Sequence, residues 1–184
     1  MRIRYNAPVT LTYALVCTLV LVLDAVSGRT LIPAFFSIGP SLDTGNPLQW
    51  LRLVTHAMGH VDWAHLMSNF AFILLIGPIL EEKYGSSGLF LMMLLTALAT
   101  GILNVLLMST GLLGASGIVF MMILLVSFTN IRSGDIPLTF ILVVALYLTR
   151  EIIASVREDS ISQFAHIVGG VCGSLFGFIR PGRS

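Results

Sequence analysis

Four polar side chains suited to acyl-transfer chemistry stand within apolar stretches of this sequence: Ser116, His166, His65 and Asn69. A serine hydroxyl is a weak nucleophile until a base removes its proton, and imidazole titrates in the range where it can do so. The tetrahedral intermediate of acyl transfer also needs hydrogen-bond donors aimed at its oxyanion. Ser116 and His166 are therefore a candidate nucleophile and base, and His65 and Asn69 are candidate oxyanion donors.

The spacing of these residues supports the assignment of roles. His65 and Asn69 are four residues apart, which on a helix places both side chains on one face. The backbone N–H of Ser116, at the start of a predicted helix, is a further candidate donor to an oxyanion. No carboxylate is placed to orient His166, because Asp159 lies seven residues earlier in the preceding loop. The pattern favours a Ser–His dyad over a triad.

Glycines surround both members of the candidate dyad. Gly114 and Gly117 flank Ser116, and the helical face that carries His166 also carries four glycines. Small residues at such positions let two membrane helices approach closely. We therefore expect the helix of His166 to pack against the helix that begins near Ser116. The glycines on the face of His166 are Gly169, Gly170, Gly173 and Gly177.

The composition indicates that these residues are held by membrane helices. Hydrophobic residues make up 56% of the 184 residues and charged residues only 10%, against roughly 25% charged in a soluble domain. A bilayer core of about 30 Å needs roughly 20 mostly apolar residues per helical crossing. The sequence predicts an all-α integral membrane protein, a single domain over residues 1–184, with six crossings. They fall near 9–27, 63–80, 87–108, 115–130, 136–150 and 161–179.

Two further features bear on the environment of this bundle. The ten basic and nine acidic residues nearly cancel and form no basic cluster, so nucleic acid is not expected as a partner. The segment from Arg29 to Asp62 is too long for a tight turn. It carries many apolar residues, so we expect it to pack at the membrane interface. These residues are Leu31, Phe35, Phe36, Ile38, Leu42, Trp50 and Leu51.

The distribution of Lys and Arg predicts the orientation, since basic loops are retained in the cytoplasm. With a cytoplasmic N-terminus, six basic residues lie inside (Arg2, Arg4, Lys83, Arg132, Arg180 and Arg183) and four outside (Arg29, Arg52, Arg150 and Arg157). Both termini are then cytoplasmic. The helices beginning near 63, 115 and 161 run from outside to inside, and their polar residues lie in the first turns. All four candidate site residues are therefore expected at one depth near the outer face.

Three motifs in order resemble the rhomboid family of intramembrane serine proteases. They are His60 to Asn69 (His-x4-His-x3-Asn), Gly114-Ala-Ser-Gly117, and Ala165-His166-x-x-Gly169-x3-Gly173, and the resemblance covers nearly the whole chain. It implies a six-helix bacterial rhomboid core with a membrane-associated first loop, a Ser116–His166 dyad, and His65 and Asn69 on the oxyanion side. It also implies the bacterial inner membrane as location. The partners expected are transmembrane protein substrates and membrane lipids, with no cofactor and no metal.

Three positions near these motifs show departures or further matches. The family's Trp-Arg motif in the first loop is interrupted here, as Trp50-Leu51-Arg52. Phe120 stands where many relatives have Tyr; it can stack on His166 but lacks the hydroxyl. Glu81 matches a structural glutamate at the inner end of the second helix.

Two alternatives remain open at this point. His56 and His60 are spaced i, i+4 and could bind zinc on a helix, although Ala57 stands where the zincin pattern has Glu. The chain could also be a rhomboid-like protein that binds membrane segments without cutting them. Relatives of that kind typically lack the serine or the histidine, and this chain has both.

Overall fold

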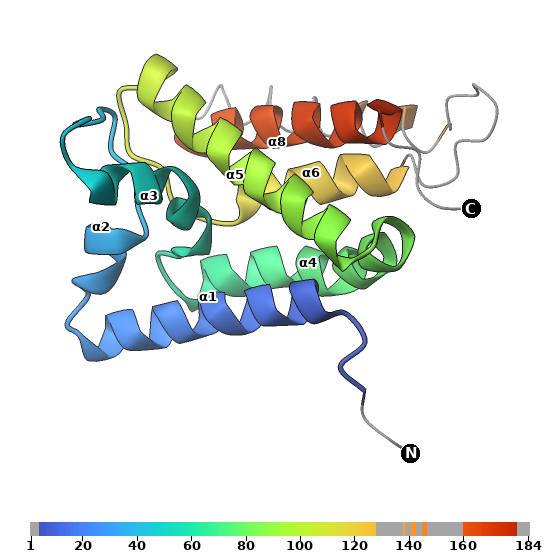
Figure 1. Ribbon diagram of the computed structural model, residues 1–184, viewed down its shortest axis with the longest axis horizontal. Coiled ribbons are helices and arrows are strands. Elements are labelled where there is room, and N and C mark those ends of the chain that lie inside the picture. Colours follow the sequence, from blue (N-terminus) through green and yellow to red (C-terminus); the bar gives the residue numbers. More distant parts are fainter. Residues whose placement is uncertain (1–3, 128–137, 139–140, 143–144, 147–159, 180–184) are drawn as a thin grey trace.

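The computed structural model describes residues 4–127, 138, 141–142, 145–146 and 160–179. The regular structure of the described residues is helical, apart from one antiparallel bridge between Ile38 and Leu112. Figure 1 shows the helices gathered into one bundle, with two short helices at one end. The elements are α1 (Pro8–Val26), α2 (Leu31–Phe35), α3 (Pro47–Thr55), η1 (His56–Met58), α4 (Trp63–Tyr84), α5 (Ser86–Leu107), α6 (Ser116–Ser127) and α8 (Ser160–Ile179).

Three of these helices, α1, α4 and α5, are long and apolar enough to cross a membrane. They confirm three of the six predicted crossings, each within a few residues of the expected bounds. The described parts of α6 and α8 are shorter apolar helices at two further predicted positions. The crossing predicted near 136–150 falls mostly outside the described residues, so the count of six stays a prediction.

One end of the bundle is organised around the carboxylate of Glu81. Its oxygens accept hydrogen bonds from the backbone N–H groups of Val9 (2.9 Å) and Thr10 (3.0 Å) and from the hydroxyls of Thr10 (2.9 Å) and Ser86 (2.7 Å). A carboxylate is stabilised at a helix N-terminus, where N–H groups lack partners within the helix. Glu81 thus joins the start of α1 to the end of α4 and the start of α5, the structural role expected for it.

The opposite end of α1 lies beside the start of α4. The Arg29 guanidinium, just beyond α1, donates to the carbonyl oxygen of Val61 at 3.0 Å, and Asp62 caps α4 by accepting from the N–H of His65 at 2.8 Å. Because α1 begins near the end of α4 and ends near its start, the two helices are antiparallel (Figure 1).

Helices α6 and α8 are in backbone contact and run in the same direction. A β-carbon added to Gly169 would overlap the carbonyl oxygen of Gly117, and one added to Gly173 would overlap that of Met121. Both contacts advance by four residues along each chain, which requires parallel helices. The predicted packing of the glycine face of α8 against α6 is confirmed.

The long first loop contains α2, α3 and η1 and packs on α5. Arg52 donates through Nε to the carbonyl oxygen of Ala34 (2.8 Å), which ties α3 to α2. Leu53 is buried, and a β-carbon at Gly101 of α5 would overlap its carbonyl oxygen. The loop therefore forms a close-packed layer over α5, while Trp50 stays half exposed.

Candidate functional site

Ser116 is the first residue of α6 and is half-buried. The segment that leads to it is fixed by the first loop. Leu112 exchanges two backbone hydrogen bonds with Ile38, at 2.8 and 3.0 Å, and the N–H of Gly114 donates to the carbonyl oxygen of His56 at 2.9 Å. These bonds set the position at which the chain turns into α6, and hence the position of the serine.

His166 lies in the second turn of α8 and is buried, with 7% of its surface exposed. Its ring stacks on that of Phe120, one turn after Ser116, with centroids 4.1 Å apart and ring planes at 35°. The contact with His166 that the sequence left open to Phe120 is thus present. Gly117 allows the approach, because a β-carbon there would already lie 3.3 Å from the carbonyl oxygen of Ala165. The residues next to Ser116 and His166 are therefore in backbone contact.

His65 approaches the same place from α4. A β-carbon added to Gly114 would lie 2.8 Å from Cε1 of His65, and Gly114 has a φ of +116°, which a residue with a side chain adopts only under strain. Glycine at this position lets the imidazole lie against the segment that precedes Ser116. The structure thus brings the His65 and Ser116 motifs together.

Asn69 lies one turn further along α4 and is 5% exposed. Its Nδ2 has no hydrogen-bond partner among the described residues. Burying an amide N–H without a partner costs about 1–3 kcal/mol, and a ligand oxygen that accepts from this group would remove that cost. A buried free donor on the face of His65 is the property that an oxyanion site requires.

His60 has a role that the sequence did not assign, although the motif that begins with it was recognised. It is fully buried, and its ring meets that of His65 edge-on, with centroids 5.0 Å apart and planes at 67°. Burial, and secondarily the charge of His65, lowers the pKa of His60 to about 4. A neutral imidazole therefore packs beside His65 near neutral pH. The five-residue spacing to His65 was the one signal available.

His56, considered with His60 as an alternative zinc ligand, is directed at α5. Its Nε2 lies 3.0 Å from the carbonyl oxygen of Ala97 and 3.5 Å from the hydroxyl of Thr100. Burial lowers its pKa to about 4. Within the residues that the structure describes, His, Cys, Asp and Glu side chains form no group of three or more that could hold a metal ion. His56 instead links the first loop to α5 and to Gly114.

The candidate site residues that the structure describes all lie at the end of the bundle opposite to Glu81. Ser116, His65 and His166 stand in the first turns of α6, α4 and α8. Asp159, considered as an orienting carboxylate, lies outside the described residues. The arrangement offers a hydroxyl, an imidazole on a parallel neighbouring helix, and further donors on a third helix, which are the groups that acyl transfer needs.

Comparison with known proteins assigns most of the chain to one family model, the Rhomboid domain, which matches residues 47–183. The chain is 36% identical over 73 residues to Rhomboid-like protein 11, chloroplastic, of Arabidopsis thaliana, covering 39% of this chain and 26% of that protein. It is 23% identical over 131 residues to Rhomboid protease GlpG of Haemophilus influenzae, covering 70% of this chain and 68% of that protein. With Rhomboid protease GlpG of Yersinia pestis it shares 23% identity over 174 residues, 93% of this chain and 62% of that protein.

Proposed function

The chain belongs to the rhomboid family and is an integral membrane protein, and from this we propose that it is an intramembrane serine endopeptidase. The similarity spans about a quarter of the Arabidopsis relative and about two thirds of the bacterial ones. The proposed activity therefore rests on the residues of this chain. The whole of 1–184 is proposed to form one protease domain of six crossings.

The proposal rests chiefly on the contact between α6 and α8, which brings the neighbours of Ser116 and His166 together at one end of the bundle. In the proposed reaction, His166 accepts the proton of the Ser116 hydroxyl while Oγ attacks the scissile carbonyl carbon. His166 then gives that proton to the leaving amine, and an acyl-serine ester remains. A water molecule, deprotonated by His166, attacks the ester, and the proton returns to Ser116 as the acid product leaves.

The negative charge on the carbonyl oxygen is proposed to be met by three donors: Nδ2 of Asn69, the imidazole of His65 and the backbone N–H of Ser116. The free buried donor on Asn69 supports this assignment. Gly114, Gly117, Gly169 and Gly173 act as supports, because each permits a close approach that a larger residue would prevent. The reaction needs no cofactor and no metal.

The proposed substrates are transmembrane segments of other proteins, cut near the end of the bundle where α6 begins. The bacterial relatives from Haemophilus influenzae and Yersinia pestis both carry the name protease. The bacterial relatives support a location in a bacterial inner membrane. The basic residues near the termini support cytoplasmic termini, with the active site towards the outer face. Water needed for hydrolysis is then available from that face.

The proposal is tested by cleavage of a model transmembrane substrate in proteoliposomes. Ser116→Ala and His166→Ala should each abolish cleavage, and the double variant should be little worse than either, because the two groups act as a unit. His65→Ala and Asn69→Ala should leave measurable turnover, reduced by about 10²–10³-fold for a single lost donor. Ser127→Ala, on the same helix, serves as the control and should cleave normally.

The same experiment separates the alternatives. Chelators should have no effect, since serine supplies the nucleophile. Loss of cleavage with a chelator, restored by zinc and dependent on His56 and His60, would support metal catalysis. Folded wild-type protein that captures a transmembrane segment without cutting it would support a binding protein. Normal cleavage by the Ser116→Ala variant would reject the serine mechanism.

A further inference from the structure

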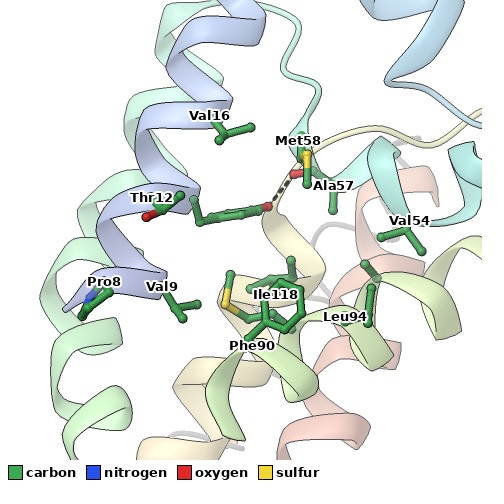
Figure 2. Close-up of a pocket in the computed structure, with 13 residues that line it drawn as sticks. Pro8, Val9, Thr12, Val16, Val54, Ala57, Met58, Phe90, Leu94 and Ile118 are labelled. Atoms are coloured by element: carbon green, nitrogen blue, oxygen red, sulfur yellow. Dashed lines mark hydrogen bonds between the residues drawn. The ribbon is translucent and has the colours of Figure 1, made fainter. Parts of the chain in front are cut away.

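A cavity of about 400 Å³ lies between α1 and α5, and Ile118 of α6 is among the residues that line it. Figure 2 shows Val9 and Val16 on the side of α1, Phe90 and Leu94 on the side of α5, and Met58 from η1 at one end. Its lining is almost wholly apolar. The cavity is partly open, and we call it the α1–α5 groove.

The groove opens onto the side of the molecule between two helices that cross the membrane. Pro8, Thr12 and Phe90 line it and are exposed. Next to it, Leu15 of α1 and Leu91 of α5 are 63% and 48% exposed. Large exposed apolar side chains on membrane-crossing helices face lipid. The groove is therefore continuous with the lipid-facing surface of the protein.

The medium beside the groove decides what fills it. An apolar cavity offers water no hydrogen-bond partners and stays dry, and an empty space forfeits the dispersion contacts of the atoms that line it. Hydrocarbon chains are present at this depth and can make those contacts. The groove follows α1 from Pro8 to Val16, eight residues or about 12 Å at 1.5 Å per residue, along the direction in which acyl chains extend.

The end of the groove at Pro8 lies next to charged groups suited to a lipid headgroup. Arg4 is exposed and precedes α1 by four residues, and Lys83 lies in the last turn of α4, beside the start of α1. Glu82 is exposed at the same end. Basic residues at a membrane surface attract the phosphate groups of lipids. We infer that one acyl chain of a membrane phospholipid occupies the α1–α5 groove, with its headgroup at the end near Arg4.

The occupied groove would bear on the candidate site through η1. Tyr13 and Ala57 both line the groove, and the hydroxyl of Tyr13 donates to the carbonyl oxygen of Ala57 at 2.6 Å, which ties α1 to η1. The backbone carbonyl oxygen of the preceding residue, His56, accepts a hydrogen bond from the N–H of Gly114. A chain in the groove therefore packs against the turn that holds the segment before Ser116. The groove itself does not depend on the serine mechanism, and its test does not measure cleavage.

The test uses the full chain reconstituted in vesicles that contain phosphatidylglycerol with a photoactivatable diazirine in one acyl chain. Met93 and Ala97 line the groove and are only 4% and 2% exposed, so surrounding lipid does not reach them. After illumination, peptide mass spectrometry should find label on these two residues as well as on Leu15 and Leu91. Label confined to Leu15, Leu91 and other exposed positions would overturn the inference.

Variants that fill the groove provide the matched comparison. Val16→Trp should lower labelling of Met93 by at least about tenfold while leaving labelling of Leu91 unchanged. Leu15→Trp adds the same ring on the lipid-facing side of α1 and should leave labelling of Met93 unchanged. If Val16→Trp does not fold, Val9→Phe fills the other end of the groove. Undiminished labelling of Met93 in a folded groove-filling variant would contradict an occupied groove.

Two further arms identify the occupant. A photoactivatable free fatty acid at the same concentration should label Met93 less than the phospholipid does, because it lacks the phosphate headgroup. Equal labelling would overturn the assignment to phospholipid. An excess of a single-spanning peptide helix should leave the labelling intact, and displacement by the peptide would assign the groove to a protein segment instead.

Discussion

At the level of single residues, the stacking of Phe120 on His166 should help to hold the imidazole in position for catalysis. The rings lie 4.1 Å apart, and an aromatic pair contributes about 0.5–1.5 kcal/mol beyond its buried area. Phe120→Leu, which keeps an apolar side chain but removes the ring, should lower kcat by about two- to tenfold. The measurement is initial rates on a model transmembrane substrate.

Phe120→Tyr is the matched control, because it keeps the ring and adds only a hydroxyl. It should cleave at a rate close to that of the wild type. A Phe120→Leu protein with an unchanged kcat would show that the imidazole is positioned without the ring.

The buried histidines make stability depend on pH. Burial lowers the pKa of His56 and of His60 to about 4, whereas both have their ordinary pKa of about 6.5 in the unfolded chain. Between these values the unfolded chain binds more protons, so the free energy of unfolding falls as pH falls through this window. The slope is about 1.4 kcal/mol per pH unit for each histidine, and the stabilisation is fully present above pH 7.

The check is the thermal unfolding midpoint in detergent between pH 7.5 and pH 5, for the wild type and for His60→Phe. The wild type should unfold at a lower temperature at pH 5, and the variant should show a smaller drop because it lacks one of the two histidines. Carboxylates lose their stabilising effect in both proteins alike. Equal pH dependence in the two proteins would contradict a depressed pKa at His60.

At the scale of elements, the contact between α6 and α8 leaves no space for a side chain at Gly173. A β-carbon there would overlap the carbonyl oxygen of Met121, and overpacking of this kind typically costs about 1–3 kcal/mol. Gly173→Leu should lower the thermal unfolding midpoint and separate His166 from Ser116, reducing cleavage although no polar group is removed.

Val171→Leu adds bulk on an exposed face of the same helix and should change neither the midpoint nor the rate. Full stability and activity of Gly173→Leu would mean that the face of α8 with Gly173 does not pack closely against α6.

The helices that consist of long apolar runs were predictable from the sequence. The runs at 9–27 and 87–108 became α1 (Pro8–Val26) and α5 (Ser86–Leu107). The helix predicted at 63–80 ends too early, because α4 continues through Pro78 to Tyr84. Its last turns are polar, and there the Glu81 carboxylate accepts hydrogen bonds from the start of α1.

The first loop was predictable only in part. Its apolar content indicated packing, but its helices α2 and α3 are short, and their positions depend on tertiary bonds such as that from Arg52 to Ala34. In the same way, the candidate dyad followed from glycine spacing and motif order. The edge-on contact of His60 with His65 depends on how a loop folds back on a helix, and the five-residue spacing of the two histidines does not determine that fold.

At the scale of the whole molecule, the arrangement predicts a definite orientation. The start of α1 and the end of α4, which Glu81 joins, lie at one end of the bundle, and the start of α6 lies at the other (Figure 1). With the basic residues near the termini retained in the cytoplasm, reporter fusions after Arg4 and after Ser184 should both report a cytoplasmic location in bacterial cells. Alkaline phosphatase and green fluorescent protein give opposite signals on the two sides and form a matched pair. An N-terminal reporter active only outside would place the candidate site at the cytoplasmic face.

If His166 activates Ser116 as the nucleophile, a fluorophosphonate probe should label that serine in the purified protein. The probe bonds covalently to serines whose hydroxyl is activated by a base. Peptide mass spectrometry should find the adduct on Ser116 in the wild type and in Ser127→Ala, and labelling should disappear in Ser116→Ala and in His166→Ala. An unlabelled Ser116 in folded protein that cleaves its substrate, or equal labelling of the His166→Ala variant, would contradict the account.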